Sequence, residues 1–320
     1  MNRYAPTSQV SSGRRRQTAD PRIGTAPEQA AAAAVRCVVN ELTIHASGGV
    51  MTAIEREPGT TSIRGLAVSR AAFKDTVATL VRWAQTRKGL QYFACVNAHC
   101  AEMANRDAKF MAALQAADIL VADGFGVILA SRIVGQPIRE RSTGPALFLA
   151  VSAALDQEGG YSVFYLGGSE RTLELIRRRH AAVFPRLGIA GTYAPPFKAD
   201  FSSVEYEEMA DLVNRVAPDV LWIGLGAPKQ EKWILANLDR LRVPLCGPIG
   251  AMFDYFAGNV PMPPQWVERA GLHWAYRLLM NPRRLWRRNL DSPLFLARVL
   301  ADRFRGVRST DAQTPSRRSP

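Results

Sequence analysis

Short apolar runs alternate with segments of helical periodicity through most of this chain, and this alternation restricts its fold more than any other feature. We expect strands near residues 35–44 and at 91–96, 119–122, 161–166, 188–193 and 220–223, with a further short strand beginning at 245. Between them, the spacing of apolar residues predicts helices at 71–87, 110–117, 146–155, 171–180 and 206–216. Such an alternation is typical of an α/β fold, a mostly parallel sheet with helices on both faces.

The chain divides into four parts. Residues 1–35 are rich in Ser, Thr, Arg, Pro and Ala without a sustained period, which predicts a disordered tail. We interpret residues 36–280 as one catalytic domain, because no strong linker interrupts them. Residues 281–306 form a basic appendage, in which Ser292-Pro293 is a favourable helix start and Gly306 a favourable stop. Residues 307–320 form a second disordered tail.

Positive charge is concentrated at the two ends of the chain. The net charge is +13, yet residues 37–276 are nearly neutral, with 24 lysines and arginines against 23 acids. Residues 1–36 hold six arginines against two acids, and residues 277–320 hold eleven against three. Cationic ends indicate phosphate-bearing partners. A neutral body, and tails without interleaved aromatic residues, argue against nucleic acid.

The appendage also carries an apolar stripe at helical spacing, formed by Phe295, Leu296, Val299, Leu300 and Phe304. A stripe of this kind beside many arginines suits the anionic surface of a membrane. The alternative is that the stripe packs on the catalytic domain. No run approaches the roughly 18 apolar residues of a membrane span, and the four cysteines show no framework spacing, so we expect a reducing, cytoplasmic location.

Asp123 is the first candidate for chemistry. It follows the apolar run 119–122 and precedes a helical pattern, and open α/β sheets place their ligands at this end of a strand. Arg139 and Arg141 lie a short distance beyond, in a polar turn, where they suit an anionic substrate. A general base at Asp123 is one interpretation, and a turn residue or helix cap is the other.

Two strand ends carry glycines suited to phosphate. Gly167-Gly168-Ser169 leads directly into a helix, whose free N–H groups attract anions. The segment 224–231, Gly-Leu-Gly-Ala-Pro-Lys-Gln-Glu, joins another strand to a helix, and Lys229 adds a point charge there. The third glycine of a dinucleotide fingerprint and the Walker A pattern are absent, and tight β–α turns would account for the glycines alone. The chain contains no Asp-x-Asp triplet, so we expect no metal and no cofactor at the site.

Taken together, these segments resemble the WecG/TagA/CpsF glycosyltransferases, also called glycosyltransferase family 26. The resemblance covers roughly residues 66–290. Its most specific part is the segment 224–231, and the other matching blocks are Asn97, Asp123–Val127, Glu140-Arg141 with Thr143-Gly144, Leu166–Gly168, Gly250 with Phe253-Asp254, Ala257-Gly258, Trp266, Gly271-Leu272, Trp274, Arg277-Leu278 and Pro282–Arg284.

The resemblance implies a Rossmann-like fold and an inverting, metal-independent transferase. Such an enzyme moves a sugar from a UDP-sugar to a polyprenyl-diphosphate-linked saccharide during cell-surface or exopolysaccharide biosynthesis, at the inner face of the plasma membrane. Asp123 matches the proposed catalytic base, and Asn97 and Arg141 match residues of the same cleft. The residues implied in UDP-sugar binding are Thr143, Gly167, Gly168, Gly224, Gly226, Pro228, Lys229, Gln230, Glu231, Gly250, Phe253 and Asp254. Those implied at the acceptor diphosphate or membrane are Arg277, Arg283, Arg284, Arg287 and Arg288.

The sequence departs from the family pattern at several positions. Cys95 stands where threonine is usual, Ala146 where aspartate is usual, Met262 where arginine is common and His273 where glutamate is common. The donor sugar is therefore left open between N-acetylmannosamine, its uronic acid and a hexose, and so is a homo-oligomeric state. The rival function is an NAD-type oxidoreductase, because parallel sheets with glycine loops serve both classes.

Overall fold

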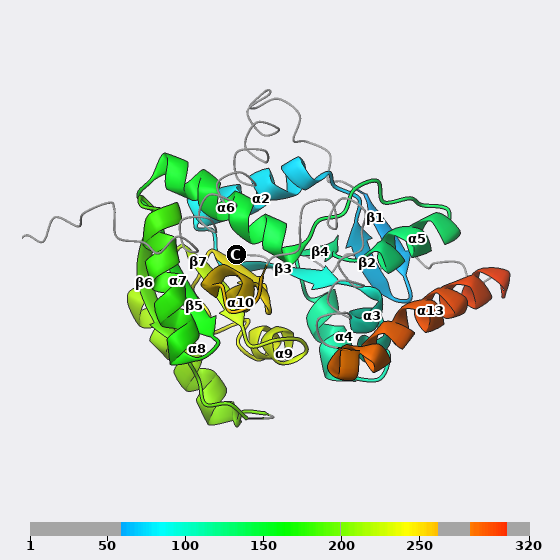
Figure 1. Ribbon diagram of the computed structural model, residues 1–320. Coiled ribbons are helices and arrows are strands. Elements are labelled where there is room, and N and C mark those ends of the chain that lie inside the picture. The colour runs from blue at the N-terminus through cyan, green and yellow to red at the C-terminus, as the bar shows by residue number, and fades with distance from the viewer. Residues whose placement is uncertain (1–58, 199, 262–281, 306–320) are drawn as a thin grey trace, which may run out of the picture.

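The computed structural model describes residues 59–198, 200–261 and 282–305, with the backbone alone for 282–290 (Figure 1). The predicted tails, the predicted strand near 35–44 and Arg277 lie outside the described residues. The strands are β1 (Thr60–Ile63), β2 (Leu66–Ser69), β3 (Gln91–Val96), β4 (Ile119–Ala122), β5 (Ser162–Gly167), β6 (Gly188–Tyr193), β7 (Val220–Gly224) and β8 (Leu245–Pro248). The helices are α2 (Phe73–Thr86), α3 (Ala98–Ala104), α4 (Ala108–Gln115), α5 (Phe125–Ile133), α6 (Gly144–Glu158), α7 (Glu170–Val183), α8 (Ser203–Val216), α9 (Lys229–Ala236), α10 (Met252–Ala257) and α13 (Pro282–Phe304).

Six strands form one parallel sheet in the order β4-β3-β8-β7-β5-β6. This confirms the predicted α/β class and the strands expected between residues 91 and 248. Because successive side chains of a strand point to opposite faces, each strand contributes to two cores. In β7, for example, Leu221 and Ile223 lie in one core, whereas Val220 and Trp222 lie in the other.

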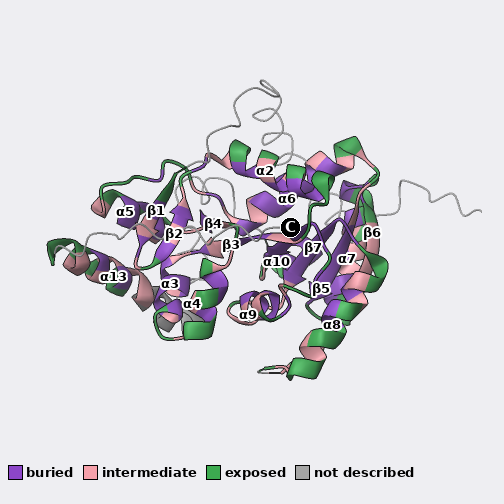
Figure 2. Ribbon diagram, turned by 180° about the vertical axis from the view of Figure 1, so that it is seen from behind, coloured by how far each residue is buried: buried purple, intermediate pink, exposed green. Residues whose placement is uncertain are grey.

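The two cores separate the helices into two layers. The core that contains Leu221 also takes buried residues of α3, α4, α5, α8, α9 and α13. The core that contains Trp222 takes buried residues of α2, α6, α7 and α10, with the Phe148 ring of α6 lying edge-on to Trp222 at 5.2 Å. In the view of Figure 2, β5 and β7 are mostly buried, and the outer faces of α2, α4 and α8 are exposed. The sheet is thus covered on both sides, as parallel sheets are.

Residues 60–69, for which no strand was predicted, form an antiparallel hairpin of β1 and β2. Arg64 and Gly65 form its turn with φ angles of 50° and 81°. Positive φ at both central residues is the geometry that matches the twist of a two-residue hairpin. The buried side chains of Ile63, Leu66 and Val68 join the core of α3 and α5.

Helix α13 begins earlier than predicted. The expected start at Ser292-Pro293 is wrong, because the helix runs from Pro282 to Phe304 and contains Pro293 in its interior. An interior proline costs a helix about 3 kcal/mol. Contacts on both sides of it offset that cost: Asp291 pairs with His99 of α3 at 2.5 Å, and Phe295 is fully buried.

The predicted apolar stripe of α13 divides between two environments. Phe295 and Val299 are buried against α3 and α5, so packing on the domain is confirmed for this half. Leu300 and Phe304 are exposed. Ion pairs hold the helix in place, since Arg298 pairs with the buried Glu102 of α3. Among the residues described, no helix is long and apolar enough to cross a bilayer.

Candidate active site

The predicted site residues that follow strands of the sheet lie together at the carboxyl ends of these strands, which we call the strand-end edge of the sheet. They follow β3, β4, β5, β7 and β8, which are neighbours in the strand order. β4 lies on one side of β3 and every later strand lies on its other side, so the strand order reverses at β3. Open α/β sheets bind ligands outside the carboxyl ends of the strands at such a reversal.

Asp123 and Asn97 lie side by side at this edge. The backbone N–H of Asp123 donates to the Val96 carbonyl at 2.9 Å, which ties the end of β4 to the end of β3. The Asn97 Oδ1 accepts the Cys100 N–H at 3.0 Å and caps α3. A Cβ on Gly124 would lie 2.9 Å from the Asn97 Cβ, so the close approach needs glycine. Asp123 is therefore not the cap of α5, because the N-cap is Gly124 and no side chain caps this helix. Its role as a general base stays a prediction.

Arg141 and Thr143 reach the same edge through the segment that leads to α6. Ser142 donates its N–H to the Ala122 carbonyl at 3.0 Å, which holds this segment along the end of β4. The Arg141 guanidinium lies over the Phe125 ring, 5.2 Å from its centroid. Thr143 caps α6 by accepting the Ala146 N–H at 3.3 Å. The structure thus brings a cation and a hydroxyl to the strand end that carries Asp123.

The two glycine loops form one continuous surface. A Cβ on Gly167 would lie 2.6 Å from the carbonyl carbon of Gly224, and one on Gly224 would lie 2.5 Å from the Phe253 ring. Gly168 also lies over this ring, and Phe253 is only 3% exposed. Phe253 is therefore a buried support beneath the loops, which differs from the predicted contact with the ligand. Bare backbone above a rigid ring is suited to the close approach of a diphosphate.

Gln230 joins the loop after β7 to the loop after β8. Its Oε1 accepts the Gly226 N–H at 3.1 Å, and a Cβ on Gly250 would lie 3.5 Å from the same oxygen. Its Nε2 donates to the Glu231 Oε1 at 2.9 Å. Gln230 and Glu231 are 4% and 3% exposed, so both stabilise the loop from beneath.

Lys229 points to a segment that the sequence did not single out. Its Nζ donates to the Lys198 carbonyl at 2.9 Å and lies 5.7 Å from the Phe197 ring and 5.9 Å from the Phe201 ring. Phe197 is fully exposed. These residues follow β6, and their position after a strand of the same sheet was the signal that could have identified them. The result is an aromatic, cationic wall beside the glycine loops.

Burial sets the acid–base properties of this region. It raises the pKa of Glu231 to about 7, although the hydrogen bond from Gln230 acts in the opposite direction. A helix N-terminus stabilises an anion by about 2 kcal/mol at most, whereas a buried ion loses several kcal/mol of solvation, so burial prevails. Burial, followed by the charges of Asp123 and Glu231, also raises the pKa of the Cys95 thiol. This coupling places the three acids in one electrostatic neighbourhood.

Some predicted residues are placed differently or lie beyond the description. Asp254 is exposed on α10 and accepts the Asn259 Nδ2 at 3.3 Å. Arg283, Arg284, Arg287 and Arg288 lie in the first turns of α13, where the structure gives the backbone alone. Their contact with an acceptor diphosphate or a membrane therefore stays a prediction.

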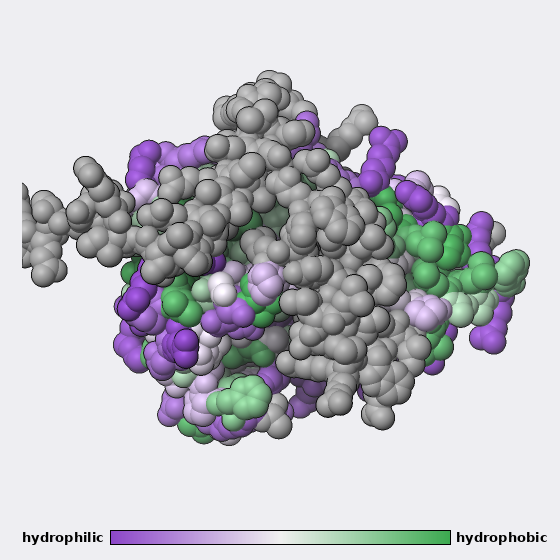
Figure 3. All heavy atoms as spheres, viewed as in Figure 1, coloured by the Kyte–Doolittle hydropathy of each residue, from purple (hydrophilic) through white to green (hydrophobic). Residues whose placement is uncertain are grey.

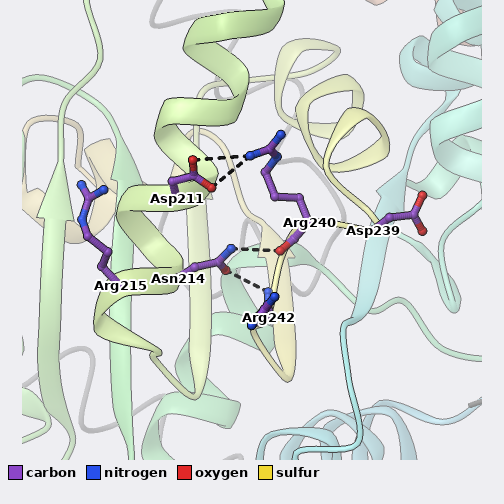
Figure 4. Close-up of a pocket in the computed structure, with 6 residues that line it drawn as sticks. All are labelled: Asp211, Asn214, Arg215, Asp239, Arg240 and Arg242. Atoms are coloured by element: carbon purple, nitrogen blue, oxygen red, sulfur yellow. Dashed lines mark hydrogen bonds and ion pairs between the residues drawn. The ribbon is translucent and has the colours of Figure 1, made fainter.

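A hollow of about 450 Å³ lies on the other side of the sheet's strand ends, where β7 and β8 begin (Figure 4). It is lined by Asp211, Asn214, Arg215, Asp239, Arg240 and Arg242, which surround the end of α8 and the approach to β8. Arg240 pairs with Asp211 at 3.2 Å and with Glu207 at 2.8 Å, so much of its charge is already balanced. None of the predicted site residues lines it, and the strand-end cluster remains the candidate active site.

Comparison with known proteins agrees with this geometry. Residues 61–309 match the Glycosyl transferase WecG/TagA/CpsF family. The chain belongs to this family. A relative from Bacillus spizizenii is 33% identical over 62% of this chain and 74% of its own length. Relatives from Bacillus subtilis and Staphylococcus aureus are 28% and 24% identical, each over 65% of this chain and 78% and 79% of their own lengths. All three are named N-acetylglucosaminyldiphosphoundecaprenol N-acetyl-beta-D-mannosaminyltransferase.

Membership of the WecG/TagA/CpsF family makes this chain a glycosyltransferase and confirms the resemblance found in its sequence. The matched span begins in the β1–β2 hairpin and extends past α13. The match to the family therefore covers the hairpin and α13 as well as the sheet.

Proposed function

We propose that this glycosyltransferase transfers a sugar from a UDP-sugar to a polyprenyl-diphosphate-linked saccharide in the biosynthesis of a cell-envelope or exopolysaccharide, with inversion at the anomeric carbon and without a metal ion. The observation that carries the proposal is the placement of Asp123 beside a continuous surface of glycine backbone at the reversal of the strand order. The relatives' names support an acceptor that carries a lipid-linked diphosphate.

In the proposed reaction, the Asp123 carboxylate accepts the proton of an acceptor hydroxyl. The hydroxyl oxygen forms a bond to the anomeric carbon while the bond from that carbon to the UDP oxygen breaks, and UDP leaves with the electron pair. The charge that develops on the diphosphate meets backbone N–H groups of the loops that follow β5 and β7, with Arg141 and Lys229 as the nearby cations. The Phe197 and Phe201 rings beside Lys229 offer apolar faces to the nucleotide.

The proposed donor carries N-acetylmannosamine, its uronic acid or a hexose. The relatives' names favour N-acetylmannosamine. Ala146 lies in the first turn of α6 and Cys95 packs under Gly144, so two of the departures from the family pattern fall beside the site. A uronic acid or a hexose is therefore proposed alongside N-acetylmannosamine.

We further propose that α13 brings the site to the anionic inner surface of the plasma membrane. Leu300 and Phe304 of α13 and Phe125 and Leu129 of α5 are exposed, and the two helices contact each other. Figure 3 shows apolar surface over this end of the molecule. The eight net positive charges of residues 277–320 complement anionic lipid. Asp123 immediately precedes α5, so membrane contact at this face would place the acceptor hydroxyl within reach of the base.

The test is a thermal-shift titration of the purified protein with UDP and with NAD, in EDTA, followed by sugar-transfer assays of Asp123→Asn. A ligand that binds the native state raises its melting temperature. We expect UDP to raise the melting temperature in EDTA, and Asp123→Asn to keep this response while losing turnover by at least a hundredfold. A response to NAD alone would support the oxidoreductase instead, and a fully active Asp123→Asn variant would remove Asp123 from the mechanism.

A further inference from the structure

Two hydrogen bonds through the Gln230 side chain connect the glycine loop after β7 to the buried acid Glu231. Gly226 donates its N–H to the Gln230 Oε1, which fixes the orientation of the amide because only its oxygen accepts. The Gln230 Nε2 must then point away from the loop, and it donates to the Glu231 Oε1 at 2.9 Å. Glu231 is 3% exposed, and its second oxygen, Oε2, is buried and has no hydrogen-bond partner among the residues that the structure describes. The acid is therefore the deepest support of the loop.

Among the described residues, the charged groups near Glu231 leave it without a balancing cation. On its own helix, Lys229 donates to the Lys198 carbonyl, and Lys232 pairs with Asp107 of α4. The titratable groups that couple to it from the neighbouring strands are acidic, since Cys95 of β3 interacts with Glu231 and with Asp123 beyond β4. A carboxylate at this position would be a buried charge whose lost solvation outweighs its hydrogen bonds from Gln230 and from its own backbone.

We propose that Glu231 is an uncharged positioning acid: its protonated form holds Gln230 and the Gly224–Pro228 loop in the shape that receives the donor diphosphate, and its ionisation weakens donor binding. The inference rests on the proposed function and adds a residue that controls its dependence on pH. Two effects act together. Ionisation places a negative charge directly behind a loop that receives an anion, and it draws solvent and the Gln230 amide toward the charged group.

The direction of the pH dependence follows from the raised pKa of about 7. Glu231 is mostly protonated at pH 6 and mostly ionised at pH 8.5. If the donor binds only the protonated form, its affinity falls up to about thirtyfold between these two pH values. Binding of the donor in the interval between them must take up protons, because it favours the protonated form.

The experiment is isothermal titration calorimetry of the full chain with UDP-N-acetylglucosamine at pH 6 and pH 8.5. This probe carries a doubly esterified diphosphate, so its own charge does not change over the interval. We expect the wild-type dissociation constant to rise by tenfold to thirtyfold at the higher pH, and that of Glu231→Gln to change by less than threefold. Glu231→Ala should bind weakly at both pH values, because Gln230 loses its acceptor. Glu208→Gln, the same chemical change at an exposed position on α8, should follow the wild type.

A second measurement keeps the inference testable if the variants do not fold. Wild-type titrations at pH 7.5 in two buffers of different ionisation enthalpy report proton uptake directly. Uptake of a substantial fraction of a proton is expected. No uptake, or an equal pH dependence in the wild type and Glu231→Gln, would overturn the role of Glu231 while leaving the transferase intact. Failure of the wild type to bind either UDP or UDP-N-acetylglucosamine would refute the proposed function itself.

Discussion

Replacement of Phe295 by alanine is expected to release α13 from the catalytic domain. The Phe295 side chain is 0% exposed and lies in the core that contains residues of α3 and α5. Phe304, nine residues later on the same helix, is 82% exposed. Truncation of a buried phenylalanine to alanine costs about 3–5 kcal/mol, whereas exposed positions usually change stability by less than about 0.5 kcal/mol. The two phenylalanines thus form a matched pair on one helix.

The loss acts mainly on the docking of α13, because this helix packs on α3 and α5 and not directly on the sheet. Among the described residues, four ion pairs to α13 remain in Phe295→Ala: Arg64 with Asp302, His99 and Arg106 with Asp291, and Arg298 with Glu102. The first has partly exposed partners, so it adds little, and pairs of this kind are typically worth below 1 kcal/mol. When α13 opens, the buried Glu102 carboxylate loses its ion pair with Arg298 and must be stabilised by water instead.

Hydrogen–deuterium exchange followed by mass spectrometry measures this docking at the level of peptides. A loss of 3 kcal/mol or more corresponds to an increase of at least about a hundredfold in the exchange rate of α13 amides that open locally. We expect this increase in Phe295→Ala, in α13 and in the facing surface of α3, with β5 and β7 still protected. Phe304→Ala should exchange like the wild type. Protection of α13 within threefold of the wild type in Phe295→Ala, or equal effects of the two variants, would refute the assignment of the buried and exposed halves.

Two further predictions concern the nucleotide loop and the membrane. Gly224→Ala should weaken UDP binding by at least tenfold with a smaller effect on global stability, because the added Cβ would lie 2.5 Å from the buried Phe253 ring and must displace the loop. Calorimetric titration with UDP measures this affinity. An unchanged affinity would contradict the close approach of Gly224 to Phe253. Phe304→Ser should reduce flotation on anionic vesicles severalfold, whereas Val204→Ser, at another exposed apolar position, on α8, should leave it unchanged. Equal flotation of both variants would contradict membrane contact by α13.

The sequence predicted the α/β class and most of the sheet because periodicity reports burial directly. The runs that became β3, β4, β5 and β7 are apolar and end at glycine, asparagine or aspartate, which is where the strands end. The β1–β2 hairpin was missed because its turn uses Arg64 in a left-handed conformation, where the usual sequence signal has asparagine or aspartate. Helix α10 was missed because its residues were interpreted as a glycine-rich binding segment.

The start of α13 was predicted wrongly for a reason that lies outside local sequence. Ser292-Pro293 is a good local signal for a helix start, yet Asp291 and Phe295 contact the domain on either side of it and hold a continuous helix. Tertiary contacts worth several kcal/mol outweigh a local preference of about 3 kcal/mol.

The sequence by itself determined the residues that can carry chemistry: an aspartate and an asparagine at strand ends, glycine loops before helices, and a motif specific enough to identify the WecG/TagA/CpsF family. Only the tertiary structure decided how they meet. The strand order placed the ends of β3, β4, β5, β7 and β8 along one edge, and it buried Phe253 beneath the loops. Within the part of the chain that the structure describes, it also left Glu231 without a cation partner. The physical reason is that periodicity records which side chains are buried, whereas the partners of a buried side chain come from segments far apart in the sequence.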